Sequence, residues 1–308
     1  MKKIILLCCV FLGVTLNAQK QKKPLTLKNF PQDKVMVVAH RGNWRDAPEN
    51  SIWAIKKAYE AGANMAEIDL NITKDSVLIL LHDRVLDRTT TAKGKPSDYT
   101  LAELKNYYLK DGAGHPTQMR IATLEEALQA AQGKIFLNLD KGFDYFDLVY
   151  PLVKKYGMEE QVLYKGEATY EQFNQKYGNI KDKICYMPII RLEKGQGWEI
   201  INGFVDNYPA YGFEFTVGAT EEKLIDFSSL RKKGYRIWVN SLWFDHNAGH
   251  NDDQALENPA VYQWYIDKKI NFYLRKAIEN ENKYKIEQKN QKILTILKKN
   301  SNIYNEKC

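Results

Sequence analysis

Short apolar runs alternate with amphipathic segments from residue 34 to about residue 267, and this alternation constrains the fold more than any other feature of the sequence. Seven runs have the length and composition of buried strands: Val35–His40, Met65–Ile72, Ile135–Asp140, Val162–Lys165, Ile184–Ile190, Gly212–Val217 and Arg236–Ser241. Helical patterns separate them: Ser51–Ala61, Leu124–Ala131, Phe146–Tyr156, Tyr170–Tyr177, Trp198–Asn207 and Glu221–Lys233. Seven alternating units predict a parallel (β/α)8 TIM barrel over residues 34–275. A doubly wound sheet also fits the alternation, but no Gly-rich phosphate loop follows the first strand.

The second strand departs from the alternation. Met65–Thr73 and Val77–Asp83 are extended runs that only three residues separate, which is too short for a parallel crossover. We therefore expect an antiparallel hairpin here, followed by an insertion before the next helix. Counting back from the turn places His82 opposite Glu67 or Ile68, depending on the register. The hairpin thus carries His82 back over the acidic end of the strand.

The charge of the chain is unevenly distributed. The formal net charge is +7, but residues 268–308 hold eleven basic and four acidic residues, and residues 1–18 hold two Lys and no acid. Residues 19–267 hold 32 basic and 34 acidic residues. The body therefore lacks the basic surplus that nucleic-acid binding requires, and we expect no nucleic-acid partner.

The first residues have the pattern of a cleavable signal peptide. Two Lys precede the apolar run Ile4–Val14, which is too short to span a bilayer, and the small residue Ala18 precedes Gln19. We expect a signal peptide over residues 1–18, a linker over 19–33, and a periplasmic or secreted protein; an N-terminal anchor is the alternative. Cleavage would leave only Cys185 and Cys308, so the fold does not depend on disulfides.

Three acidic residues lie at the carboxyl ends of predicted neighbouring strands. Glu67 and Asp69 are two residues apart on one strand, so both side chains point to the same face. Asp140 ends the next strand. Carboxylates that meet there repel one another unless a cation or protons intervene, and oxygen ligands favour Mg²⁺ or Ca²⁺. The alternative is a solvated edge strand whose acids face water.

Further candidates lie at the ends of other strands. His40 and Arg41 end the first strand before Gly42, where an imidazole and a planar guanidinium suit proton transfer and phosphate binding. Lys165 ends a later strand and either meets a phosphate or is solvated. Asn50 or Ser51 either caps the following helix or takes part in binding.

In order and spacing, these motifs resemble those of the glycerophosphodiester phosphodiesterase family. The resemblance runs from about Val35 to Asn240, and its most specific part consists of His40-Arg41-Gly42, Pro48-Glu49-Asn50-Ser51, Glu67-Ile68-Asp69, Thr73-Lys74-Asp75 and His82-Asp83. It implies a TIM barrel that hydrolyses glycerophosphodiesters to glycerol 3-phosphate and an alcohol with a divalent metal ion, Ca²⁺ or Mg²⁺. It further implies roles by position: catalytic His40 and His82; metal ligands Glu67, Asp69 and Asp140; substrate-binding Arg41, Lys165 and Asn240.

Three departures from the family pattern stand out. Many members have a Glu-x-Lys ending where this chain has Asn138-Leu139-Asp140-Lys141, although the related venom sphingomyelinases D also use Asp there. The usual Trp-Thr-Val-Asn reads Ile237-Trp238-Val239-Asn240, which keeps the Asn. The final Thr-Asp-x-Pro motif is absent after Ile270-Asn271-Phe272, which predicts an atypical eighth strand.

The end of the chain and the resemblance leave alternatives open. Residues 276–308 are a basic tail with two possible accounts. Either residues 276–300 form an amphipathic helix that packs on the barrel or touches an anionic surface, or the tail comes from a shifted reading frame. A second functional hypothesis is a phospholipase D-like or cyclising phosphodiesterase acting on lysophospholipids or glycerophosphoinositol. A third is a catalytically weak barrel that binds phosphodiesters or glycans.

Overall fold

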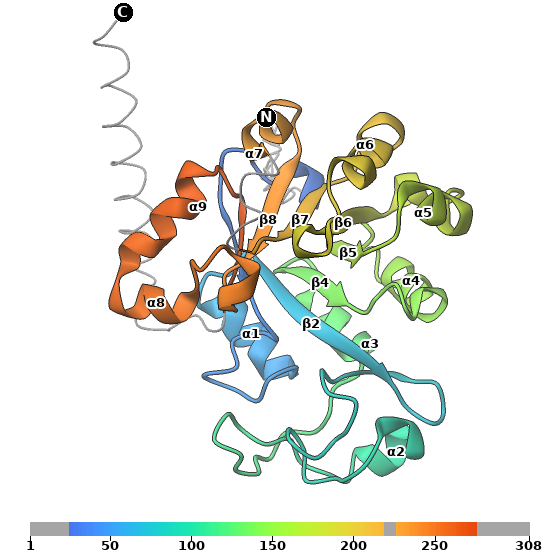
Figure 1. The fold of residues 1–308 in the computed structure, drawn as a ribbon. Coiled ribbons are helices and arrows are strands. Elements are labelled where there is room, and N and C mark those ends of the chain that lie inside the picture. Colours follow the sequence, from blue (N-terminus) through green and yellow to red (C-terminus); the bar gives the residue numbers. More distant parts are fainter. Residues whose placement is uncertain (1–24, 219–225, 276–308) are drawn as a thin grey trace, which may run out of the picture.

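Eight parallel strands pair into a closed ring in the computed structural model, which describes residues 25–218 and 226–275 (Figure 1). The strands are β1 (Met36–Ala39), β2 (Met65–Ile72), β4 (Phe136–Asp140), β5 (Val162–Gly166), β6 (Cys185–Arg191), β7 (Gly212–Thr216), β8 (Arg236–Asn240) and β9 (Phe272–Arg275). The ring closes because β1 pairs with both β2 and β9. The predicted (β/α)8 barrel is confirmed, while the predicted signal peptide over 1–18 and the basic tail over 276–308 lie outside the described residues.

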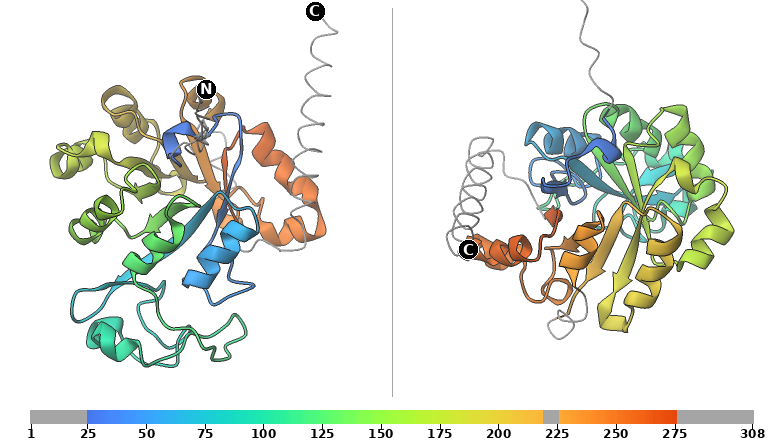
Figure 2. Two further views of the ribbon diagram at one scale, coloured as in Figure 1. Left: turned by 180° about the vertical axis from the view of Figure 1, so that it is seen from behind. Right: turned by 90° about the horizontal axis from the view of Figure 1, so that it is seen from above.

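Helices cover the outside of the ring (Figure 2). They are α1 (Ile52–Glu60), α3 (Leu124–Ala131), α4 (Phe146–Lys155), α5 (Tyr170–Tyr177), α6 (Trp198–Asn207), α7 (Phe227–Lys232), α8 (Asp252–Glu257) and α9 (Gln263–Asp267). The last two were not predicted, because they are short and lie among Asn, Asp and Pro residues that weaken a helical pattern. Within the described ranges, no helix has the length and apolar character that crossing a membrane requires.

The eighth strand forms although its family motif is missing. Phe272 pairs in register with Met36 of β1 and with Trp238 of β8. Its ring stacks on the indole of Trp238 with a centroid distance of 4.8 Å. Pairing uses backbone groups that any non-proline sequence offers, so a strand with an apolar inward residue suffices to close the ring.

The interior of the ring is a packed apolar core up to its carboxyl end. Inward side chains from several strands fill it, including Met36, Met65, Phe136, Leu163 and Trp238. The segment 25–30, part of the predicted linker, closes the amino-terminal end: Leu27 is buried there, and its carbonyl accepts a 2.8 Å hydrogen bond from the Tyr211 hydroxyl. Each large side chain buried in this way contributes about 1.5–3 kcal/mol of stability.

The predicted hairpin is present and its register is now settled. β3 (Leu78–Leu80) pairs antiparallel with β2, and Leu70 lies opposite Leu80. Of the two registers considered, this is the one in which His82 would lie opposite Ile68, although the ladder ends at β3. The insertion that follows contains α2 (Leu101–Leu104) and has its own small apolar core, including Leu86, Leu104 and Leu109. It lies beyond the end of β2 (Figure 1).

Candidate active site

Three carboxylates meet at the carboxyl end of the barrel. Glu67 and Asp69 project from β2 and Asp140 from β4, and the strand register places Asp69 beside Asp140. One oxygen atom from each residue lies within 4.8 Å of the others. Glu67 is only 4% exposed and Asp69 only 1%. The structure therefore brings together the three residues predicted as metal ligands.

The electrostatics of this cluster favour a bound cation. Burial raises the pKa of Glu67 well above its usual range, and the charges of Asp69 and Asp140 raise it further. Burial also raises the pKa of Asp69, opposed by a hydrogen bond from Asn50. Buried carboxylates at this separation need protons or positive charge, and hard divalent cations prefer such oxygen ligands. The donor set therefore fits Mg²⁺ or Ca²⁺.

The turn after β1 holds one oxygen of the cluster in place. The backbone amide of Arg41 donates a 2.8 Å hydrogen bond to Oε2 of Glu67. Arg41 adopts the left-handed conformation with φ of 54°, and Gly42 follows with φ of 74°. A Cβ atom at Gly42 would lie 2.7 Å from the backbone and side chain of Ala54 in α1, so only glycine fits this close approach.

Of the two roles weighed for Asn50 and Ser51, the structure shows the helix cap, and it is made by Ser51. The Ser51 hydroxyl caps α1 by accepting a 3.0 Å hydrogen bond from the amide of Ala54. Asn50 instead binds Asp69 twice: its Nδ2 donates to Oδ2 at 2.8 Å, and its Oδ1 accepts from the backbone amide at 3.0 Å. Asn50 therefore orients one of the metal-ligand candidates.

The Arg41 side chain links the carboxylate cluster to a second network of charges. Its Nη1 donates to Glu49 at 2.9 Å, and its Nε lies 3.6 Å from Oδ2 of Asp69. Glu49 also accepts two hydrogen bonds from Arg88, which makes two more to Asp83. Although burial opposes it, these two guanidinium groups hold the pKa of Glu49 below its usual value. The sequence reading did not assign a role to Glu49, Arg88 or Asp83.

His82 has a fixed ring orientation. Its Nδ1 lies 2.7 Å from Oδ1 of Asp83, and hydrogen bonds from Arg88 hold the pKa of Asp83 well below its usual range. An ionised carboxylate only accepts hydrogen bonds, so Nδ1 carries the proton and Nε2 is left for chemistry. Lys141, whose role the family pattern left open, donates from Nζ to the His82 carbonyl at 2.8 Å. Lys141 thus fixes the backbone of the hairpin end.

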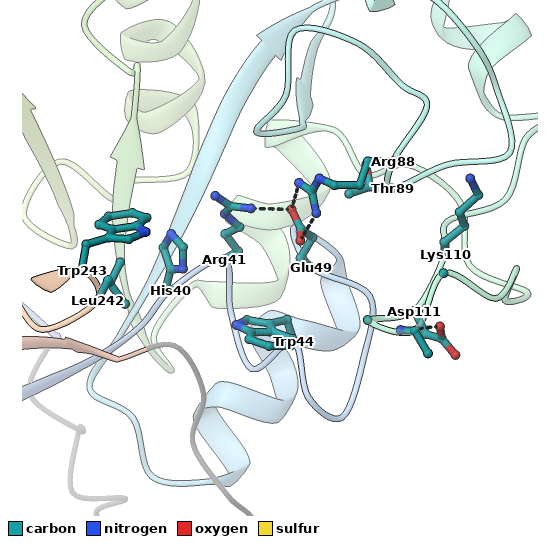
Figure 3. Close-up of a pocket in the computed structure, with 13 residues that line it drawn as sticks. His40, Arg41, Trp44, Glu49, Arg88, Thr89, Lys110, Asp111, Leu242 and Trp243 are labelled. Carbon is teal, nitrogen blue, oxygen red and sulfur yellow. Dashed lines mark hydrogen bonds and ion pairs between the residues drawn. The ribbon is translucent and has the colours of Figure 1, made fainter. Parts of the chain in front are cut away.

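His40 and Glu49 lie on opposite sides of Arg41, and all three residues line a groove of about 540 Å³. Figure 3 shows His40 beside Trp243 at one end of the groove, with Arg41, Glu49 and Arg88 along it. The His40 and Trp243 rings meet edge to face at 5.9 Å. A proton carrier and a guanidinium therefore share an open surface next to the carboxylates.

Lys165 and Asn240 lie deeper and share a partner that the sequence reading missed. Lys165 Nζ is 2.6 Å from Oε2 of Glu214, and Asn240 Nδ2 donates to Oε1 of Glu214 at 2.8 Å. The ammonium lies 4.1 Å from the centre of the Trp238 ring, which settles that Trp238 faces the interior. Neither Lys165 nor Asn240 lines the groove beside His40. The pattern Gly-Phe-Glu-Phe-Thr in β7, with one acid between outward aromatics, was the available signal for Glu214.

Comparison with known proteins points to the same family as the sequence motifs do. Residues 40–178 match the model of the glycerophosphoryl diester phosphodiesterase family, and residues 186–273 match a domain of unknown function. A glycerophosphodiester phosphodiesterase from Caldanaerobacter subterraneus is 36% identical over 139 residues, which cover 42% of this chain and 57% of that protein. Glycerophosphodiester phosphodiesterase 1 of Rattus norvegicus is 36% identical over 147 residues, 45% of this chain and 43% of that protein. The chain thus spans about half the length of the curated relatives it matches.

Solved structures share the fold over most of the chain. A glycerophosphoryl diester phosphodiesterase from Parabacteroides distasonis has a TM-score of 0.67 at 24% identity and covers 83% of this chain and 90% of its own. A phosphodiesterase from Oleispira antarctica, solved with the product sn-glycerol-3-phosphate, has a TM-score of 0.57 at 19% identity, covering 79% and 93%. The match to the family model includes His40, Arg41, Glu67, Asp69, His82 and Asp140. The chain therefore matches the glycerophosphodiester phosphodiesterase family in sequence over residues 40–178, and it shares the fold of solved glycerophosphodiester phosphodiesterases over most of its length.

Proposed function

We propose that this protein hydrolyses glycerophosphodiesters to sn-glycerol 3-phosphate and an alcohol, with Mg²⁺ or Ca²⁺ held by Glu67, Asp69 and Asp140. The observation that carries the proposal is the three-carboxylate cluster, in which Glu67 and Asp69 are buried and Asp140 is partly buried. The cluster shares one barrel mouth with Arg41 and His82. The family match over residues 40–178 supports the reaction class, and a phosphodiesterase of the same fold was solved with the product sn-glycerol-3-phosphate.

A cation at this cluster would supply Lewis-acid stabilisation of the negative charge that develops on the phosphoryl oxygens. The chain's own residues prepare the site for the anionic substrate. Asn50 fixes the carboxylate of Asp69, and the Arg41 amide fixes that of Glu67. The Arg41 guanidinium stands between the cluster and the groove, where it can hold a phosphate oxygen.

His40 and His82 are the proposed acid–base pair. One imidazole removes a proton from the nucleophile, which is water or the glycerol 2-hydroxyl, and the other donates a proton to the leaving alkoxide. Asp83 keeps the His82 ring in one tautomer, with Nε2 available. The two imidazoles work in opposite protonation states, so the activity follows a bell-shaped pH profile.

Trp243 supports a second candidate, a phospholipase D-like or cyclising reaction on lysophospholipids or glycerophosphoinositol. This indole is 47% exposed and lies at the His40 end of the groove. Tryptophan suits the boundary between water and lipid because its ring is apolar and its N–H is polar. A cyclic phosphate product, or faster turnover of lysophospholipid in vesicles than of soluble diesters, would favour this candidate.

Export is proposed with the function. The basic and apolar start of the chain, residues 1–18, supports a periplasmic or secreted enzyme, and the basic residues of 276–308 support peripheral contact with an anionic membrane. Cell fractionation and N-terminal sequencing test export: the exported protein is expected to begin at Gln19.

The reaction is tested by the release of glycerol 3-phosphate from a panel of glycerophosphodiesters. The protein is treated with EDTA, and Mg²⁺ or Ca²⁺ is then added back. We expect release only after add-back, and loss of about 10²–10⁴-fold in kcat for His40→Ala and for His82→Ala. Full activity in both histidine variants, or no turnover of any diester by a folded, metal-binding protein, would contradict the proposal. The latter outcome would favour the third hypothesis, a catalytically weak barrel that binds phosphodiesters or glycans.

A further inference from the structure

The groove beside His40 continues well past the residues that the proposed chemistry uses. It runs from His40 and Trp243, past Arg41, to Lys110 and Asp111 in the insertion (Figure 3). A volume of about 540 Å³ is sufficient for a small polar ligand. The insertion therefore supplies one end of a binding groove whose other end lies at the candidate catalytic residues.

Arg41 divides this groove from the carboxylate cluster. A diester whose phosphate contacts Arg41 has one arm on each side of it. Glycerol hydroxyls suit the cluster side, because a hard cation there accepts oxygen ligands. The groove side then receives the other arm, which is the alcohol that leaves.

Most charges along the groove are already paired within the protein. Arg88 makes four hydrogen bonds, two to Glu49 and two to Asp83. Asp111 Oδ1 accepts hydrogen bonds from the backbone amides of Ala113 and His115, which hold the carboxylate within its own turn. The Arg88 charge is therefore balanced by two carboxylates, and one oxygen of Asp111 is occupied by backbone donors.

Lys110 is the exception. Its Nζ donates one hydrogen bond of 2.8 Å, to the backbone carbonyl of Asp87. Among the described residues, no carboxylate lies within ion-pair distance of this ammonium. An ammonium group has three donors, so it can donate further hydrogen bonds to a ligand in the groove. This end of the groove therefore carries an ammonium group whose remaining donors are available to a ligand.

Trp44 provides an apolar surface between the two ends. It belongs to the loop between β1 and α1, and its ring lies against the insertion at Gly112, where an added methyl group would be 3.5 Å from the indole. A flat ring beside hydrogen-bond donors is typical of sites that bind polyhydroxylated rings and chains, whose C–H faces are apolar. The Arg45 guanidinium already lies 5.7 Å from the centre of this ring, so repulsion between like charges disfavours a quaternary ammonium group there.

We infer that this groove binds the alcohol half of the diester and selects oxygen-rich headgroups, polyhydroxylated or anionic, over quaternary ammonium headgroups, with Lys110 as the selecting residue. The inference rests on the proposed function, because it takes the substrate to be a glycerophosphodiester. It assigns to the insertion a role in substrate choice.

The test compares glycerophosphoinositol and glycerophosphoglycerol with glycerophosphocholine. We expect kcat/KM to be about tenfold or more higher for the first two. Lys110→Met is expected to remove most of this preference, because it lowers kcat/KM more for the oxygen-rich diesters than for glycerophosphocholine. Lys110→Arg, which keeps a charged donor, is expected to retain the preference. Lys134→Met is the matched control, since Lys134 also donates to a backbone carbonyl but does not line the groove.

Calorimetric dissociation constants for glycerophosphoinositol and glycerophosphocholine separate this inference from the proposed function. If no diester is hydrolysed, the proposed function fails, and the ratio of the two constants still decides the headgroup preference. Glycerophosphocholine bound or hydrolysed as well as the oxygen-rich diesters would overturn the inference. The same preference in Lys110→Met as in Lys134→Met, both folded by thermal melting, would also overturn it.

Discussion

The backbone amide of Arg41 donates a 2.8 Å hydrogen bond to Oε2 of Glu67, so the end of β1 holds a carboxylate of β2. This bond satisfies one oxygen of Glu67 and leaves the other for a cation. It depends on the left-handed turn at Arg41 and Gly42, which packs on α1. The proposed phosphate-binding residue and a proposed metal ligand are thus joined through backbone geometry as well as through side chains.

Gly42→Ala tests that geometry. The new methyl group would need the space of Ala54 and a strained φ of 74°, so we expect a loss of about 1–3 kcal/mol in the free energy of unfolding. Chemical denaturation measures this loss. Gly62→Ala is the control, because φ is also positive there but no atom lies within 4 Å of the added methyl group. Equal losses in both variants would show that strain alone, without the close approach to α1, explains the effect.

Substitutions at Asn50 and Ser51 are expected to change different properties, metal affinity for Asn50 and stability for Ser51. Ser51→Ala removes a helix cap and should cost about 1 kcal/mol of stability with little change in activity. Asn50→Gly keeps the positive φ available but removes both hydrogen bonds to Asp69. It should weaken metal affinity about 10–100-fold. Metal titration and thermal melting of both variants distinguish the two; unchanged metal affinity in Asn50→Gly would contradict the assigned role.

The raised pKa values of Glu67 and Asp69 predict how the metal-free protein responds to pH. A carboxyl group whose pKa is raised by folding binds its proton more tightly in the folded state. Its ionisation therefore destabilises the fold as pH rises from the unfolded pKa through the raised one. In EDTA, we expect Glu67→Gln to melt at a higher temperature than the wild type, by a margin that grows as the pH rises above the ordinary pKa of a glutamic acid. A margin independent of pH would contradict this account.

Breaking the Lys165–Glu214 pair is expected to be costly. Both side chains are buried, 7% and 5% exposed, so either single substitution leaves an unpaired charge. Lys165→Met or Glu214→Gln should each cost about 3–5 kcal/mol, and the double variant Lys165→Met/Glu214→Leu less than the sum. A double-mutant cycle of unfolding free energies measures the coupling. Additive losses would mean that the two groups act independently.

The sequence predicted those features that depend on local periodicity. Strand alternation places Glu67 and Asp69 on one face, and the short turn after Thr73 requires a hairpin; both expectations are confirmed. Asp140 could be predicted to lie beside them because neighbouring parallel strands end at the same edge of the sheet, and the register confirms this. These inferences need only spacing along one or two strands.

Features that depend on distant parts of the chain could not be predicted. Lys165 and Glu214 lie on β5 and β7 and meet across the barrel interior, which no spacing indicates. Lys110 reaches the groove because of how the insertion folds around its own small core. The missing Thr-Asp-x-Pro motif was a misleading signal for β9, because the ring needs backbone pairing there and Phe272 supplies the packing.

Metal binding tests the central claim most directly. Calorimetric titration of the EDTA-treated, dialysed protein with Mg²⁺ or Ca²⁺ is compared with the same titration of Glu67→Gln and Asp140→Asn, and with Asp147→Asn as the control, whose carboxylate lies outside the cluster. The account predicts saturable binding in the wild type and the control, and its loss in both cluster variants. Equal binding in all four folded proteins, or none in the wild type, would contradict it.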